Sequence, residues 1–179
     1  LKHFEDRTEG GFFLTANDGE KLLIRAKEIY DGAIPSGNSV MALNLLRVHK
    51  ITGKEEYLNS AEDLFSAFSG FLEKNPQGAE VLLHALDFAL APAKEIVIAG
   101  EAGSKDTTRL IETINEHFMP AKVLLFRPTN IEKPEITTLS PFLINHGLIK
   151  GKAAAYICEN QTCQKPLTDI AKLSKELAK

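Results

Sequence analysis

The sequence predicts a mixed α and β fold in two parts that meet near Pro92. The spacing of apolar residues is mostly helical before Pro92, and short β-branched runs alternate with helical segments after it. The composition, 44% hydrophobic and 25% charged residues in 179, is that of an ordinary globular chain able to bury a core. We therefore expect a helical part with an N-terminal β-hairpin over residues 1–91 and a small α/β segment with a parallel sheet over residues 92–179.

The expected hairpin lies before residue 31. Residues 10–15 (GGFFLT) are aromatic and β-prone, Asp18 and Gly19 are typical of a tight turn, and residues 21–30 (KLLIRAKEIY) can return as the second strand. A helix over residues 19–30 is the alternative, because Lys, Leu, Glu and Ala favour helix. The turn signal favours the hairpin.

Three helices should follow the hairpin. Val40 to Val48 and Ala79 to Leu90 are apolar nearly all round, so we expect both to be covered on more than one side. Residues 54–73 carry a single apolar stripe at spacings of four and three, formed by Tyr57, Ala61, Leu64, Phe68 and Phe71. This alternation of buried and amphipathic helices suits a layered α/α array or a small bundle.

The second part begins with the strand KEIVIAG at residues 94–100. A helix over about residues 105–117 and the strand AKVLLFRP at 121–128 follow, which is a βαβ unit and predicts a parallel pair of strands. The expected sheet-facing stripe of this helix is Thr107, Leu110, Ile111, Ile114 and Phe118, with Pro120 ending the helix. A strand in KAAAYICEN and a helix over about 166–178 complete the chain.

Charge and hydropathy exclude several function classes. The formal net charge is −3 with acidic and basic residues interspersed, so no nucleic-acid partner is expected. The apolar stretches are short and interrupted, so no membrane span is expected. The chain begins Leu-Lys-His, which suggests a fragment of a longer protein, and its two cysteines are too few for a secreted disulfide framework. We expect a cytoplasmic location and no cofactor.

The loop DGAIPSGNSV, residues 31–40, has two compatible interpretations. Pro35 and Gly37 resist helix, and Ser36, Asn38 or Ser39 can cap the helix that follows. The same polar side chains could also hold an anionic or hydroxyl-rich ligand at the positive end of that helix.

Three stretches carry a family resemblance. FEDRTEGGFF at 4–13, RAKEIYDGAIPSGNSVMALNLLRVHKITG at 25–53 and AAAYICENQTCQKP at 153–166 resemble the C-terminal part of the thioredoxin-domain-containing, spermatogenesis-associated protein family, which includes uncharacterised bacterial and archaeal relatives. The resemblance implies a thioredoxin-like domain followed by an (α/α)6 toroid similar to N-acylglucosamine 2-epimerases and six-hairpin glycosidases. Residues 1–91 would then be the last helical hairpins of an incomplete toroid.

The resemblance also implies partners and a site. The partners would be a carbohydrate ligand and the missing thioredoxin-like and toroid parts of the same protein; the fragment would self-associate through apolar faces such as Val40, Leu43 and Leu46. The site would lie in the toroid funnel, near Gly10 and Gly11. Its catalytic residues would be Asp6, Glu9 and Asp31, and its substrate-binding residues Phe12, Arg25, Lys27, Ser36 and Asn38. Carboxylates can act as acid and base on a sugar and an aromatic ring can stack on it, but loop capping explains Asp6 and Glu9 equally well.

Cys158 and Cys163 are a candidate redox pair. CENQTC is not the C-x-x-C of a thioredoxin-like site, and no second Cys or His pair completes a zinc site, so no metal is expected. The two could form a disulfide if the turn brings their Cα atoms within about 7 Å. Two thiols in a strand and turn are the alternative.

The remaining polar motifs suggest structural roles. Residues 101–108 lack the spacing of phosphate-binding loops, and Ser104 or Asp106 can cap the helix there. A hydrogen-bonded core histidine is the favoured interpretation of His84 beside Asp87. The other histidines show no ligand-like spacing and receive no role: His3, His49, His117 and His146.

Two functions therefore stay open. The first is a portion of a carbohydrate-active toroid with acid and base chemistry on a sugar. The second is a non-catalytic packing or interaction module that supports a thioredoxin-like domain and exchanges thiols with it. Fold alone does not decide between them.

Overall fold

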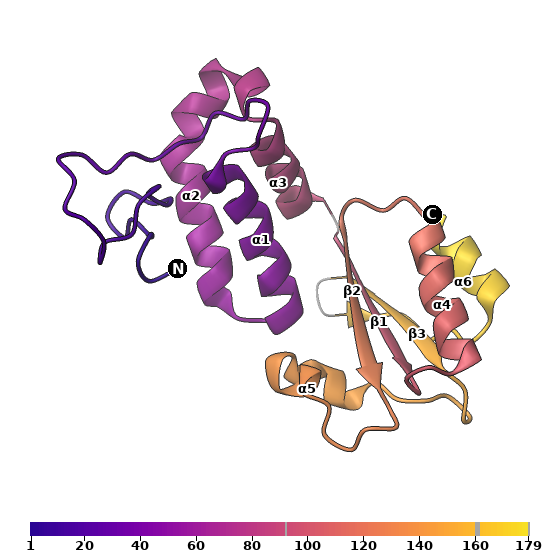
Figure 1. The fold of residues 1–179 in the computed structure, drawn as a ribbon. Coiled ribbons are helices and arrows are strands. Elements are labelled where there is room, and N and C mark those ends of the chain that lie inside the picture. The colour runs from indigo at the N-terminus through magenta and orange to yellow at the C-terminus, as the bar shows by residue number, and fades with distance from the viewer. Residues whose placement is uncertain (92, 160–161, 179) are drawn as a thin grey trace. The chain divides into compact units, whose positions relative to one another are not determined.

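A computed structural model describes residues 1–91, 93–159 and 162–178 (Figure 1). The chain forms two compact units, Leu1–His49 with Gly53–Ala91 and Lys50–Thr52 with Pro92–Lys179. The described residues hold six α-helices and four β-strands, which confirms the mixed α and β fold class.

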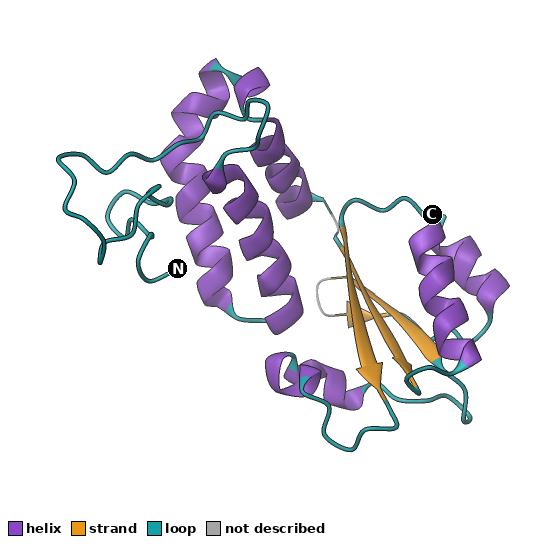
Figure 2. Ribbon diagram, viewed as in Figure 1, coloured by secondary structure: helices purple, strands orange, loops and turns teal. Residues whose placement is uncertain are grey.

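The first unit is built on three helices, α1 (Gly37–Thr52), α2 (Glu55–Lys74) and α3 (Glu80–Leu90), with the 3-10 turn η1 (Pro76–Gly78) between the last two. Figure 2 shows these helices with long loops before them. The apolar stripe predicted on α2 is confirmed, because each of its five side chains is buried or half-buried.

The predicted N-terminal β-hairpin is wrong, and so is the alternative helix. The described residues 13–35 contain no strand, and one backbone hydrogen bond, from Leu14 N to the Ala26 carbonyl, links the two expected arms. A single antiparallel bridge joins Glu5 to Phe12. Leu23 and Ile24 are exposed, so the second arm has no apolar partner surface that would hold it as a strand.

The two apolar helices differ from expectation. Leu43 and Leu46 of α1 are buried, because the rest of this chain covers them, so the prediction that they form an exposed apolar face is wrong. Val40 is 40% exposed, as predicted. On α3, Leu83 and Leu90 are exposed, so this helix has an uncovered apolar side.

The second unit contains the βαβ element that the sequence predicts. Strands β1 (Lys94–Gly100) and β2 (Lys122–Pro128) pair in parallel on either side of α4 (Lys105–Glu116) in the chain. The sheet as a whole is mixed, with the order β2-β1-β3-β4, because β3 (Ala154–Glu159) runs antiparallel to β1. A long connection with α5 (Ile136–Leu139) and the 3-10 helix η2 (Pro141–Asn145) precedes β3, and β4 (Thr162–Cys163) ends the sheet.

Helices α4 and α6 (Ile170–Leu177) cover one face of this sheet (Figure 1). The core between them is aliphatic and contains Ile96, Ile98, Leu110, Ile114, Ala155, Ile157, Leu173 and Leu177. Phe118 was expected on the sheet-facing stripe but is 92% exposed, because α4 ends at Glu116 and the extended backbone of His117 turns the chain away. None of the helices in the described part of the chain combines the length and apolarity that a bilayer crossing requires.

Candidate functional site

Asp6 is held by hydrogen bonds from its own loop and from Lys27. Its carboxylate accepts the backbone N–H groups of Thr8 at 3.0 Å and Glu9 at 3.2 Å, and the Nζ of Lys27 at 2.8 Å. The hydrogen bond from Lys27 is the main cause that lowers the pKa of Asp6 to about 2, and the two backbone N–H groups add to it. Asp6 is therefore ionised at neutral pH, and this environment does not suit a general acid.

Lys27 ties the rest of this loop together. Its Nζ also donates to the Gly10 carbonyl at 3.0 Å and lies 3.5 Å from the Glu9 carboxylate, whose side chain is 77% exposed. Gly10 and Gly11 both have positive φ values, and a Cβ at Gly10 would collide with the Asp63 carbonyl. These glycines thus serve the path of the loop.

Asn38 clamps the N-terminal loop onto the start of α1. Its Nδ2 donates to the carbonyls of Phe12 at 2.9 Å and Glu28 at 2.8 Å, and its Oδ1 accepts the Phe12 N–H at 2.7 Å. Asn38 is 1% exposed, and the Phe12 ring is also buried. Asn38 is therefore not placed to contact a ligand in this conformation, and Phe12, which borders one of the hollows described below, is only 6% exposed.

Asp31 and Ser36 join the loop to two helices. The Asp31 carboxylate accepts the N–H of Ser36 at 2.8 Å and the N–H of Val81, in the first turn of α3, at 2.9 Å. Ser36 is the N-cap of α1, and its Oγ accepts the Ser39 N–H at 3.1 Å. The stretch from Asp31 to Val40 therefore works as a helix entry.

Arg25 completes this group. Its Nη2 donates to the carbonyls of His3 at 3.2 Å and Thr15 at 2.5 Å, and its guanidinium carbon lies 4.0 Å from the centroid of the Phe13 ring. Arg25 therefore stabilises backbone that is outside helices and strands, as do the other predicted site residues around it.

Two hollows lie beside this loop. The larger, about 450 Å³ in volume, is lined by Lys2, Glu5, Asp6, Arg7, Thr8, Phe13 and Asn17. The smaller, about 210 Å³, is lined by Glu5, Asp6, Arg7, Gly10, Gly11, Phe12, Ser60 and Asp63. Asp6 borders both hollows, whereas Glu9 and Asp31 border neither, so the three predicted catalytic carboxylates do not converge on one of them.

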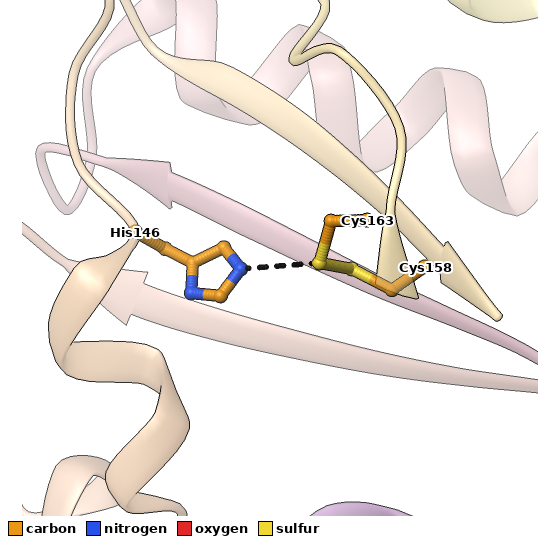
Figure 3. A group of neighbouring side chains, drawn as sticks. All are labelled: His146, Cys158 and Cys163. Carbon is orange, nitrogen blue, oxygen red and sulfur yellow. Dashed lines mark hydrogen bonds between the residues drawn. A yellow bond between two sulfur atoms is a disulfide. The ribbon is translucent and has the colours of Figure 1, made fainter. Parts of the chain in front are cut away.

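The cysteine pair lies in the second unit, where β4 turns back against β3. Cys158 and Cys163 are direct partners across the two strands, with Cα atoms 3.9 Å apart, and their sulfur atoms form a disulfide (Figure 3). Cys158 is buried and Cys163 is exposed. The two residues of the pair therefore differ in their exposure to solvent.

His146 brings a third chemical group to the pair. It follows η2, is buried, and places its Nε2 3.6 Å from the Sγ of Cys163 (Figure 3). Its Nδ1 lies 3.1 Å from the Phe142 carbonyl oxygen. Because a carbonyl can only accept, Nδ1 carries the proton and Nε2 presents its lone pair to the sulfur.

Aromatic neighbours fix the orientation of this imidazole. The Tyr156 ring packs against it edge to face, with centroids 4.6 Å apart, and Phe142 does so at 6.0 Å. The Tyr156 hydroxyl donates to the Gly147 carbonyl at 2.8 Å, which fixes the residue next to the histidine. Burial lowers the pKa of His146, the hydrogen bond to Phe142 opposes this, and the charge of Arg127 lowers it further.

Sequence reasoning gave His146 no role. It lies 12 and 17 positions from the two cysteines, and no motif of that spacing signals a shared site. The folding of the connection before β3 brings the three side chains together. The only sequence signal was the pairing of two cysteines near a strand end.

Comparison with known proteins supports a relationship over almost the whole chain. No family model matches. Spermatogenesis-associated protein 20 of Homo sapiens is 36% identical over 180 residues, which cover 98% of this chain and 22% of that protein. The Mus musculus protein of the same name is 35% identical with the same coverage, and the uncharacterized protein B0495.5 of Caenorhabditis elegans is 27% identical over 167 residues, 92% of this chain. The chain spans only about a fifth of these relatives' length, 22% in each case. It is thus homologous, along nearly all of its residues, to a segment of spermatogenesis-associated protein 20.

Proposed function

We propose that this chain is a redox-responsive interaction module of a longer protein, in which the disulfide between Cys158 and Cys163 opens and closes by thiol–disulfide exchange. The observation that carries the proposal is the Nε2 lone pair of His146, 3.6 Å from the sulfur of the exposed Cys163. A thiol beside a proton acceptor that is itself oriented by a hydrogen bond is the arrangement that activates cysteine nucleophiles.

The electrons and protons of this exchange balance when an external dithiol is the reductant. Its thiolate attacks Sγ of Cys163, the bond to Cys158 breaks, and Cys158 leaves as a thiolate that takes up a proton. The second thiol of the reductant then attacks the mixed disulfide and releases Cys163. Two electrons and two protons have moved to the chain, and the external dithiol has become a disulfide.

The partner that we propose is the thioredoxin-like domain that the family resemblance implies for the longer protein. A cytoplasmic location is also part of this proposal. The thiols of that compartment would keep Cys158 and Cys163 mostly reduced, and oxidative conditions would form the disulfide between them. The similarity of the first unit to part of an (α/α)6 toroid remains a prediction. The relationship to bacterial and archaeal proteins is also still a prediction.

Single-cysteine variants test which sulfur exchanges. In Cys158→Ser, the exposed Cys163 remains and should form a mixed disulfide with oxidised glutathione, seen as one adduct by intact-mass spectrometry. In the matched Cys163→Ser variant, the buried Cys158 should react at least about tenfold more slowly, because exposure limits attack on a thiol. Equal adduct formation by the two variants would contradict the proposed entry at Cys163.

Carbohydrate binding is a second candidate, and the smaller hollow is the observation that favours it. Glu5, Asp6 and Asp63 border this space of about 210 Å³ together with Ser60, so carboxylates could accept hydrogen bonds from sugar hydroxyl groups. The proposal concerns binding; epimerase or glycosidase chemistry in the longer protein stays a prediction. A thermal-shift panel of monosaccharides, N-acyl sugars and disaccharides tests it, with Asp63→Ala expected to abolish stabilisation by any sugar that binds. A panel with no stabilisation would refute it.

A further inference from the structure

We propose that, after reduction of the disulfide, the thiolates of Cys158 and Cys163 and the Nε2 of His146 form a site for one thiophilic divalent metal ion such as Zn²⁺. The role of this metal site in the cell rests on the proposed function, in which the same disulfide is opened by reduction. The metal site itself follows from three ligand atoms that the fold has already brought together.

The ligand set suits a soft or borderline cation. The Sγ atoms of both cysteines and a ring nitrogen of His146 lie within 4.8 Å of one another. Two thiolates and one neutral imidazole are typical ligands for Zn²⁺ and match its preference for sulfur and nitrogen. The hydrogen bond from Nδ1 to the Phe142 carbonyl leaves Nε2 free to coordinate, which is the common outer support of a metal-bound histidine.

The spacing is close to that of a tetrahedral site. With Zn–S bonds of about 2.3 Å and Zn–N bonds of about 2.05 Å, a tetrahedron needs about 3.6 Å between sulfur and nitrogen and about 3.8 Å between the two sulfurs. The distance of 3.6 Å from Cys163 Sγ to His146 Nε2 meets the first requirement for one sulfur, and the ligand atoms of Cys158 and His146 lie within 4.8 Å of each other. The second requires the two sulfurs to move apart once their bond is broken.

The chain can supply this separation at Cys163. Cys163 is exposed and lies in a two-residue strand, β4, at the end of the sheet, whereas Cys158 is buried in β3 beside β1. A movement of Cys163 Sγ away from Cys158 Sγ that keeps its distance to Nε2 therefore leaves the other two ligands in place. The nearby positive charge of Arg127 opposes a cation, and the two thiolate charges outweigh it.

Three protein ligands leave a fourth position for water or another small ligand, as in zinc sites that are not closed. Metal binding and the disulfide exclude each other. An external disulfide that oxidises the two metal-bound thiolates would take their two electrons, leave as two thiols after gaining two protons, and release the ion. The site would therefore couple the redox state of the pair to metal release.

Cobalt and zinc titrations of the chain test the inference. The wild-type chain is reduced with a phosphine, and Co²⁺ is added as a spectroscopic probe, followed by Zn²⁺ in competition. We expect one ion per reduced chain, with a thiolate-to-cobalt charge-transfer band, and no specific binding to the oxidised chain. His146→Ala should weaken binding by at least about tenfold, because even the loss of an outer-shell partner costs 10- to 100-fold. His117→Ala, which alters a histidine bonded to Ser174 instead, should bind as the wild type does.

A reduced and folded wild-type chain that binds no ion would overturn the inference, and so would a His146→Ala chain that binds as tightly as the wild type. Circular dichroism of each reduced variant establishes that it is folded. Phosphine reduction opens the pair whether or not exchange operates, so the two proposals can fail separately. Metal binding without exchange in glutathione buffers would refute only the redox function, and exchange without metal binding would refute only the metal site.

Discussion

Replacing His146 with alanine should slow the oxidation of the reduced pair. The structure places the Nε2 lone pair 3.6 Å from Sγ of Cys163, where, once the pair is reduced, it can accept the thiol proton and leave the thiolate that attacks an external disulfide. A proton acceptor beside a thiol raises the fraction of thiolate, which is the form that attacks a disulfide. The weaker nucleophilicity of a more acidic thiol offsets part of that gain. The wild type should therefore react faster than His146→Ala by a factor on the order of three.

Stopped-flow oxidation by excess oxidised glutathione at pH 7 measures this ratio directly, with alkylation and mass spectrometry to count the remaining thiols. His117→Ala is the matched control, because it removes a histidine of the same unit that contacts Ser174 and not the cysteines. Equal rates for the wild type and His146→Ala would refute the idea that the imidazole assists the thiol. A slower control would show that the effect is not specific to this histidine.

The remaining predictions concern the N-terminal loop. Asn38→Ala should lower the free energy of unfolding by about 3 kcal/mol, because the buried backbone groups that hydrogen-bond to Asn38 lose their partners. The control Asn44→Ala, at an exposed position of the same helix, should lower it by less than about 0.5 kcal/mol. Urea denaturation measures both values, and equal losses would contradict the role of Asn38. Asp31→Ala should cost about 1–2 kcal/mol in the same assay, because two backbone N–H groups at helix starts lose their acceptor, and an unchanged midpoint would contradict this role. Asp6→Asn should reduce the loss of stability that the protein shows as the pH falls from about 4 to 2. The pKa of Asp6 falls from 3.8 to about 2 on folding, so the ionised carboxylate contributes its full stabilisation above about pH 4 and loses it as the pH falls towards 2. Unfolding midpoints of both proteins across this range should converge at the acid end, and a constant gap between them would be the contrary result.

The regular elements were predictable because local patterns determine them. The stripe on α2 and the strand, helix and strand of β1, α4 and β2 are each set by the period of apolar residues. The antiparallel placement of β3 was not predictable, because it depends on the path of a long connection without a strong periodic signal.

The N-terminal segment shows where pattern reasoning fails. Asp18 and Gly19 do signal a turn, but a strand also needs a partner that pairs with its backbone and covers its side chains. Here side chains distant in sequence, Arg25 and Asn38, pair with the backbone instead. A local pattern cannot reveal such long-range hydrogen bonds.

The candidate site was predictable only in part. The resemblance pointed to residues around Asp6 and Asn38, and in the structure the hydrogen bonds of these residues serve the loop. The pairing of Cys158 with Cys163 was one of two alternatives that the sequence left open. The contact of His146 with this pair arises from tertiary structure alone.

A redox titration of the wild-type chain tests the central claim most directly. The chain is equilibrated in glutathione buffers of graded potential, quenched with acid and alkylated, and the fraction of reduced Cys158 and Cys163 is read by mass spectrometry. The account predicts a single reversible two-electron transition within the range of the buffers, reached equally from the reduced and the oxidised side. A pair that stays fully oxidised or fully reduced across all buffers, from either starting state, would contradict it.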